Sequence, residues 1–305
     1  MGAIFLGTPA AAVPSLCALA QVADIELVVT QPDKPGKRSR MGIPPPVKTA
    51  AHQFGFPVAQ PATSAELDAV ITRSMATFGL VVAYGRILTE GVLSRLPMGF
   101  LNVHFSLLPR WRGAAPVERA IAAGDETTGV TLMRIDEGLD TGPVLAERAT
   151  DIAPDETGGT LTARLAYLGA RLVDDAVPDY LRGRRLPVPQ IDTGTTHAAR
   201  LSRDEARLVS STGVVEAERS IRAFNPRPGA WIVTDAGEIK IHRASITDRP
   251  AHLPGSIRMV DAAPVLALAD GGLRLVRVQP QGKESMDGAD WMHGRRVDQL
   301  TVIDR

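Results

Sequence analysis

A hydrogen-bonding amide and an imidazole that can act as an acid or a base stand close together in the stretch LNVHFSLLPRWRGAAP, which begins at Leu101. The apolar residues around them predict a buried strand, and Asn102 and His104, at alternate positions, leave the same face of it. Pro109 ends this strand and begins a loop. Ligands of open α/β sheets bind outside the carboxyl ends of the strands, so an amide and an imidazole placed there indicate an active site.

A carboxylate follows a second apolar strand, which is predicted over Gly129–Met133. The segment DEGLDTGP after that strand contains Asp140. A single Asn or His is commonly a hydrogen-bonded core or turn residue, and this structural interpretation competes with the catalytic one. An amide, an imidazole and a carboxylate at strand ends together form a general acid–base set. Asn102, His104 and Asp140 are therefore the candidate catalytic residues.

The elements that must position these residues predict an α/β fold. Apolar runs and helical periodicity indicate strands and helices in alternation, and two successive strands separated by a helix form a right-handed parallel crossover. The main predicted elements are strands at Gly2–Leu6, Ile25–Thr30 and Leu80–Ala83, and helices at Ala10–Ala20 and Thr160–Leu181. The prediction is a Rossmann-like domain with a mainly parallel sheet and helices on both faces. The turn at Gly7 lacks the G-x-G-x-x-G pattern, so NAD binding is not favoured.

The periodic pattern stops at Gly183 and resumes near Ser202, which indicates a linker containing Pro187 and Pro189. After the linker come a helix over Val214–Ala223 and several short strands separated by Gly-rich turns. Short strands at this spacing are typical of a small β-barrel. The predicted organisation is a catalytic domain over 1–183, a linker over 184–203 and a C-terminal domain over 204–305.

Composition limits the possible partners and compartments. The chain has 305 residues, 44% of them hydrophobic, and a formal net charge of zero. No global field attracts a polyanion, so contact with nucleic acid needs a local basic patch. The single Cys17 fits a reducing compartment, and no signal segment or membrane span is recognisable. We expect a cytoplasmic protein with no metal, since no metal-ligand spacing is present.

The connection from Gln31 to Lys48 is strongly basic. It carries five Lys or Arg residues against the single acid Asp33, together with several prolines. One interpretation is a solvated surface loop. The other is a loop that contacts phosphates, because clustered Lys and Arg supply the sequence-independent part of nucleic-acid binding.

At these motifs the chain resembles the 10-formyltetrahydrofolate-dependent formyltransferases, and most closely the branch that acts on methionyl-tRNA. The resemblance rests on NVHFSLLPRWRGAAP with the downstream DEGLDTGPVL. It extends to other segments along nearly the whole chain, namely FLGTP, QPDKPGKRSR, PPPVK, VVAYGRIL and IRAFNPRPGAW. It implies 10-formyltetrahydrofolate as the formyl-donor co-substrate, methionyl-initiator tRNA as the acceptor, and an OB-like barrel for the C-terminal domain, which would contact tRNA. We expect a monomer.

The resemblance also assigns binding residues. It implies that Ser106-Leu107-Leu108-Pro109 lines the folate site and that Tyr84 and Gly85 border the pterin pocket. It places Arg38 in a loop that enters the tRNA acceptor stem, with Lys37 and Arg40 beside it. The family usually has glycines around that arginine, where this chain has Lys37 and Ser39.

Two other functions stay open from the sequence. The first is a formyltransferase for a small amine, such as glycinamide ribonucleotide or an amino sugar nucleotide, although the C-terminal segment and the basic loop argue against it. The second is a non-catalytic RNA-binding protein on the same fold, against which the complete set of Asn102, His104 and Asp140 argues. Ser106 lacks the G-x-S-x-G context, so a serine hydrolase is disfavoured.

Overall fold

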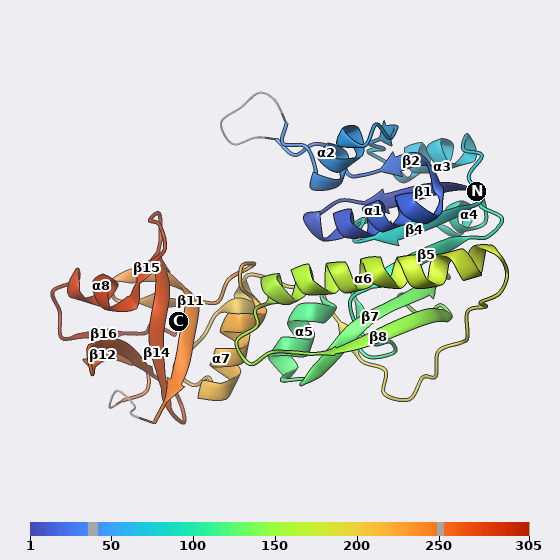
Figure 1. Cartoon of the computed structure of the whole chain (residues 1–305). Helices are drawn as coiled ribbons and strands as arrows, with labels where there is room; N and C mark the ends of the chain where they lie inside the picture. Colours follow the sequence, from blue (N-terminus) through green and yellow to red (C-terminus); the bar gives the residue numbers. More distant parts are fainter. Residues whose placement is uncertain (36–41, 249–252, 305) are drawn as a thin grey trace. The chain divides into compact units, whose positions relative to one another are not determined.

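The computed structural model describes residues 1–35, 42–248 and 253–304 (Figure 1). The chain forms two compact units, and each contains segments that are separated in the sequence. The first unit consists of Met1–Pro116, Thr127–Asp151 and Thr162–Ala198, and the second of Val117–Glu126, Ile152–Leu161 and Ala199–Arg305. The domain boundaries given from the sequence stay a prediction.

A seven-stranded sheet is the centre of the first unit, with the strand order β3-β2-β1-β4-β5-β7-β8. The strands from β3 to β5 pair in parallel, and β7 and β8 continue the sheet in antiparallel pairing. Their bounds are β1 Gly2–Gly7, β2 Asp24–Val29, β3 Val58–Ala59, β4 Phe78–Val82, β5 Phe100–His104, β7 Thr127–Arg134 and β8 Val144–Asp151. The predicted mainly parallel α/β sheet is confirmed.

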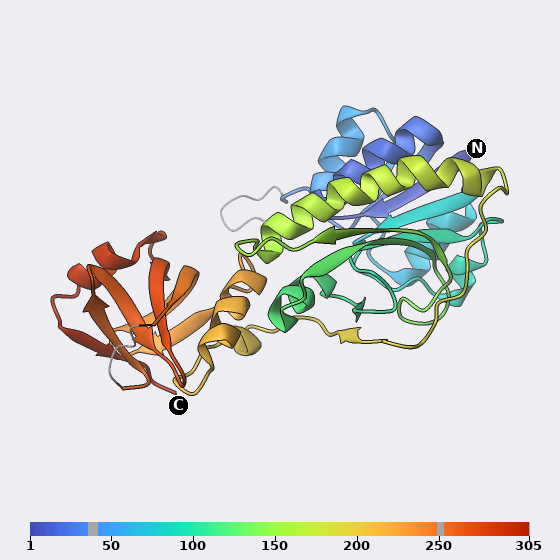
Figure 2. The ribbon, with the colours of Figure 1, turned by 60° about the horizontal axis from the view of Figure 1, so that its bottom comes forward.

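Helices pack on both faces of this sheet. On one face, α3 and α4 pack on apolar side chains of β1, β4 and β5, in a cluster that includes Ile4, Leu67, Val92 and Phe100. On the other face, α6 approaches so closely that a Cβ at Gly169 would lie 2.7 Å from Val103 Cγ1, and Figure 2 shows this helix running across the sheet. The helices are α1 Val13–Val22, α2 Pro46–Gln53, α3 Ser64–Thr72, α4 Glu90–Leu93 and α6 Gly158–Leu181, with a 3-10 turn at Ala10–Ala12 before α1.

Part of the segment predicted as a linker is built into the first unit. Strand β9 (His197–Ala198) pairs in parallel with β6 (Arg112–Gly113), and Val188 pairs with Val144 at the start of β8. The absence of apolar periodicity in this segment reflects its short backbone pairings, which bury few side chains. Residues 188–198 therefore lie against the loops that follow β5 and β7.

The second unit contains an antiparallel sheet with the strand order β10-β11-β14-β13-β12-β16, and β15 pairs with β14. Its strands are β10 Trp231–Thr234, β11 Gly237–Thr247, β12 Ser256–Val260, β13 Ala263–Ala267, β14 Gly272–Pro280, β15 Met286–Asp287 and β16 Gln299–Thr301. The two end strands meet, because Ile303 N–H donates to Val233 O at 2.9 Å and Asp235 N–H donates to Thr301 O at 3.0 Å. The sheet thus curls into the small barrel that the short strands predicted.

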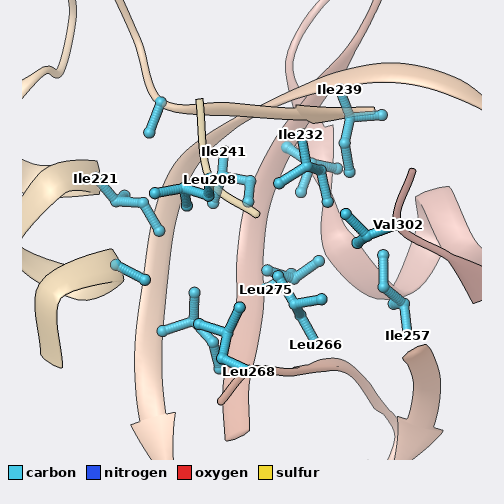
Figure 3. Close-up of a cluster of buried hydrophobic side chains, with 14 of the residues drawn as sticks. Leu208, Ile221, Ile232, Ile239, Ile241, Ile257, Leu266, Leu268, Leu275 and Val302 are labelled. Carbon is cyan, nitrogen blue, oxygen red and sulfur yellow. The ribbon is translucent and has the colours of Figure 1, made fainter. Parts of the chain in front are cut away.

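The barrel has its own hydrophobic core, shown in Figure 3. Leu266, Leu273 and Leu275 point inward from adjacent strands, and Ile221 of α7 packs on them. The helices of this unit are α5 Pro116–Ala123, of which Val117–Ala123 belongs to it, the start of α6 over Gly158–Leu161, α7 Val214–Ala223 and α8 Gly288–His293, with a 3-10 turn at Asp204–Ala206. Among the described residues, no helix is both long and apolar enough to cross a membrane.

Candidate active site

Strand β5 places Asn102 and His104 on one face because side chains alternate along a strand. Both lie on the side that Phe100 shares with α3 and α4, while Leu101 and Val103 take the opposite side. His104 is the last residue of β5 and is 5% exposed. In the antiparallel pairing with β7, His104 lies opposite Thr131 and Asn102 opposite Met133. His104 ends β5 as predicted, whereas Asn102 is the third of the five residues of the strand, two positions before that end.

Asp140 lies in the loop after β7, and the carboxylate receives its contacts from β5 and from the β5–α5 loop. Its Oδ1 accepts a hydrogen bond from Asn102 Nδ2 at 3.4 Å, and its Oδ2 accepts one from the backbone N–H of Gly113 at 2.8 Å. Asp140 has a left-handed backbone with φ of +54°, a conformation that Asp tolerates better than most residues. The structure thus brings the three candidate catalytic side chains together.

The imidazole of His104 lies between two oxygen atoms. Its Nδ1 is 3.6 Å from Asp140 Oδ2, and its Nε2 is 2.9 Å from the carbonyl oxygen of Trp111. A carbonyl only accepts hydrogen bonds, so Nε2 carries a proton in this arrangement. The ring is then fixed in orientation, with Nδ1 turned to the carboxylate that can take up or return a proton.

The segment Ser106 to Pro109 forms a loop that is tied to β7 through one hydroxyl group. Thr131 Oγ1 donates to Ser106 O at 2.7 Å and accepts from the backbone N–H of Leu108 at 3.1 Å. Ser106 Oγ donates to Arg110 O at 2.6 Å, so this hydroxyl stabilises its own loop. Ser106 and Leu108 are buried, while Leu107 and Pro109 are half-buried. The predicted folate role of these four residues stays a prediction.

Tyr84 and Gly85 follow β4, the strand next to β5. The backbone oxygen of Tyr84 accepts hydrogen bonds from Thr8 Oγ1 at 2.9 Å and from Gln31 Nε2 at 3.2 Å, so the carboxyl ends of β1, β2 and β4 converge there. The side chain of Tyr84 is buried in the core beneath, and this burial raises the pKa of its phenol. A pterin-pocket role therefore concerns the backbone at Tyr84 and Gly85 rather than the phenol.

Three further residues of the site were not singled out from the sequence. Arg112 is 6% exposed, and its guanidinium donates to Gln190 Oε1. Gln190 in turn donates to the backbone of the Asp140 loop, and Thr196 Oγ1 accepts from the N–H of Trp111 at 2.9 Å. Gln190 and Thr196 lie in the segment predicted as a linker, so no sequence pattern indicated them. Arg112 stands in the RWRG motif, which was the available signal.

Two predicted features concern residues or groups that the structure does not place at the site. Lys37, Arg38 and Arg40 lie outside the described residues, so their predicted tRNA contact stays a prediction. Within the described part of the chain, no group of three or more His, Cys, Asp or Glu side chains is arranged to hold a metal ion.

The fold and the matched families define a formyl transferase with an additional C-terminal domain. Residues 3–177 match the formyl transferase family, and residues 200–296 match the formyl transferase C-terminal domain. The chain is 44% identical over 298 residues to the methionyl-tRNA formyltransferase of Halorhodospira halophila strain DSM 244 / SL1. The matched residues cover 96% of this chain and 96% of that relative. The chain belongs to the methionyl-tRNA formyltransferase family, and it is an enzyme of the transferase class.

Solved structures with low sequence identity share the fold. HypX from Aquifex aeolicus in complex with tetrahydrofolic acid has a TM-score of 0.65 and 15% identity, over 95% of this chain and 46% of that chain. An N-formyltransferase from Helicobacter canadensis, in complex with folinic acid and dTDP-3-aminofucose, has a TM-score of 0.66 and 17% identity, over 90% of this chain and 98% of that chain. At these identities the likeness concerns the fold alone.

Proposed function

We propose that this enzyme transfers the formyl group of 10-formyltetrahydrofolate to the amino group of methionyl-initiator tRNA, giving N-formylmethionyl-tRNA for translation initiation. The acceptor is supported by the 44% identical relative, which is named for methionyl-tRNA. The donor is supported by the fold shared with HypX, which was solved with tetrahydrofolic acid. The observation that carries the site is the convergence of His104, Asn102 and the Gly113 N–H on the Asp140 carboxylate.

The transfer is direct and uses no covalent enzyme intermediate. The neutral amine attacks the formyl carbon and forms a C–N bond, and the former carbonyl oxygen becomes an oxyanion. The tetrahedral intermediate collapses when the bond from that carbon to N10 of the folate breaks. Asn102 can donate its amide N–H to the oxyanion, and preorganised donors of this kind stabilise developing charge without reorganisation.

His104 and Asp140 handle the proton that the amine must lose. Nδ1 of His104 faces Asp140 Oδ2 at 3.6 Å, so the imidazole and the carboxylate can hold the proton of the amine between them. The same proton then goes to N10 of the folate as that nitrogen leaves, so the reaction needs no net proton from solvent. The hydrogen bonds from Asn102 and Gly113 keep the carboxylate oriented while this occurs.

The acceptor tRNA is expected to contact two regions of the chain. Arg38, with Lys37 and Arg40, supplies a contact to the acceptor stem, and this assignment comes from the sequence resemblance. The barrel unit contributes a hollow of about 750 Å³ beside α7 and β11, whose lining includes the exposed Arg243. Cations at such positions bind phosphates without reading sequence.

A competition assay tests the acceptor. The purified enzyme and 10-formyltetrahydrofolate are offered methionyl-initiator tRNA, free methionine, glycinamide ribonucleotide and a dTDP-amino sugar. Formylation of the tRNA at a kcat/KM several orders of magnitude above that of the small amines is the expected result. Preference for a small amine would contradict the proposal and favour the alternative suggested by the fold shared with the Helicobacter canadensis enzyme.

A further inference from the structure

Gln190 connects a buried charge to the loop that carries Asp140. Its side-chain oxygen accepts hydrogen bonds from Arg112 Nε at 3.1 Å and from Arg112 Nη2 at 2.8 Å. Its side-chain nitrogen donates to Asp140 O at 2.9 Å and to Gly142 O at 2.7 Å. Both hydrogens and both lone pairs of the amide are therefore used, which fixes the side chain in one orientation.

The contacts of Gln190 act on the conformation of the catalytic loop. Asp140 has a φ of +54°, a left-handed conformation that costs free energy in a non-glycine residue, even one that tolerates it as Asp does, and that surrounding contacts must offset. Gln190 holds the carbonyl groups of Asp140 and Gly142 on one side, and the Gly113 N–H holds the carboxylate on the other at 2.8 Å. The backbone and the side chain of Asp140 are thus fixed from two separate segments.

The rigidity of Gln190 comes from Arg112. The Arg112 side chain is 7% exposed. Its Nη2 lies 3.2 Å from Oδ1 of Asp192, a side chain that is 90% exposed. A buried guanidinium needs its donors satisfied, so the two bonds to Gln190 are costly to break. An amide is the group that suits this position, since its oxygen serves the guanidinium and its nitrogen serves the two carbonyl groups.

We propose that Gln190 is a positioning residue for the formyl transfer and acts by holding Asp140 in its catalytic orientation. This inference rests on the role proposed above for Asp140. Gln190 lies between the two segments that match the family, 3–177 and 200–296, in the stretch that the sequence indicated as a linker. The stretch thereby takes part in the chemistry of the first unit.

The test replaces the amide by groups that separate its two contacts. In Gln190→Glu the carboxylate still accepts from Arg112, so the buried guanidinium keeps a partner, but its oxygens face the carbonyl groups of Asp140 and Gly142. We expect kcat to fall by about 10- to 100-fold, the range typical for partners that orient a reactive group. The KM values for folate and tRNA should change less than about twofold. Gln53→Glu, at the exposed end of α2, is the matched control and should behave as wild type.

A double-mutant cycle with Asp140→Asn separates positioning from a general structural effect. If Gln190 acts through Asp140, Gln190→Glu should lower kcat by no more than about twofold in the Asp140→Asn background. A wild-type kcat for Gln190→Glu, or a loss that multiplies in full with Asp140→Asn, would overturn the inference while leaving the role of Asp140 intact. A wild-type kcat for Asp140→Asn would instead refute the proposed role of Asp140 and the inference with it. Gln190→Asn, which keeps the amide on a side chain one methylene shorter and so withdraws it from the Asp140 loop, is the second variant if the Glu variant fails to fold, and the same fall in kcat is expected.

Discussion

Asp140 is the residue on which the polar contacts of the site meet. One carboxylate oxygen faces the Asn102 amide, and the other faces both the His104 ring and the Gly113 N–H. The type and strand position of Asn102 and His104 could be predicted, because alternation along an apolar strand fixes the face of each residue. Their distances to Asp140 could not be predicted, because these depend on a loop conformation that has no periodic signal.

Asn102→Asp tests the charge arrangement at this residue. The variant puts an oxygen where Asn102 Nδ2 now lies 3.4 Å from Asp140 Oδ1, so two carboxylates meet and each opposes ionisation of the other. At neutral pH we expect kcat to fall about 100-fold or more, because the oxyanion donor is lost as well. As the pH falls and the pair takes up a proton, activity should partly recover. A pH–rate profile measures both effects.

Asn102→Ala is the comparison variant, since it removes the donor without adding charge. Its kcat should also fall, but the pH of its maximum activity should stay at the wild-type value. Equal pH profiles for Asn102→Asp and Asn102→Ala would contradict the proposed proximity of the two side chains.

Gln190 and Thr196 show where prediction from sequence stopped at the residue scale. Their segment has no apolar periodicity, because it joins the first unit through short backbone pairings and side-chain amide and hydroxyl contacts. Such contacts depend on tertiary proximity across more than 40 residues, and no local pattern encodes them. Arg112 is different, because its motif pointed to the region but not to its buried partner.

At the scale of elements, the loop between β7 and β8 is closely packed. A Cβ added at Gly142 would overlap the backbone oxygen of Arg134, with which the loop is in contact. Gly142→Ala must therefore displace the loop that carries Asp140. We expect kcat to fall at least about tenfold while the KM for folate changes little, measured by steady-state kinetics. Gly91→Ala in α4, where the nearest atom is Thr89 Oγ1 at 4.0 Å, should leave kcat unchanged. A wild-type kcat for Gly142→Ala would show that the loop position is not needed.

The basic connection from Gln31 to Lys48 gives a second prediction at this scale. It is longer than the two to six residues usual for a βα connection, and its charge suits a polyanionic substrate. Arg38→Ala should lower kcat/KM for methionyl-tRNA and leave folate affinity unchanged. A phosphate contact would also reduce the salt slope of tRNA binding by about one. Equal kinetics for Arg38→Ala and wild type, across salt concentrations, would return this segment to a solvated surface loop.

The sequence predicted the central strands well and the barrel strands less completely. Buried parallel strands such as β1 and β4 are continuous apolar runs, which can be recognised directly in the sequence. Strand β11 covers Gly237–Thr247, but the apolar residues that indicate a strand end at Ile241. The second half of the strand consists mostly of polar residues that are exposed or partly exposed. Strand β12 had no clear signal, since it is a short strand next to the turn at Asp261-Ala262.

At the scale of the whole molecule, the sequence predicted the catalytic residues in the first domain and a small barrel in the C-terminal domain. The structure adds that the first unit extends to Ala198 and includes Gln190 and Thr196. A chain shortened at Gly183 would therefore lose contacts of the site itself. Point substitutions in the full chain are the cleaner way to ask what the barrel contributes.

Arg243→Ala is such a substitution, in the hollow beside α7 and β11. If the barrel contacts tRNA there, the KM for methionyl-tRNA should rise about threefold or more, and the salt slope of binding should fall by about one. The KM for folate should not change. Arg73→Ala, an exposed arginine at the end of α3, is the control and should match wild type. Identical tRNA kinetics for the Arg243 and Arg73 variants would remove this hollow from the tRNA site.

The most direct test of the account is single-turnover transfer of labelled formyl from 10-formyltetrahydrofolate to methionyl-initiator tRNA, with enzyme in excess. Wild type should convert the bound tRNA to N-formylmethionyl-tRNA. His104→Ala should bind both substrates and transfer at least about 100-fold more slowly, the scale of a lost positioned acid or oxyanion donor. No transfer by wild type would contradict the proposed activity. Transfer by His104→Ala at the wild-type rate would contradict the catalytic role of His104.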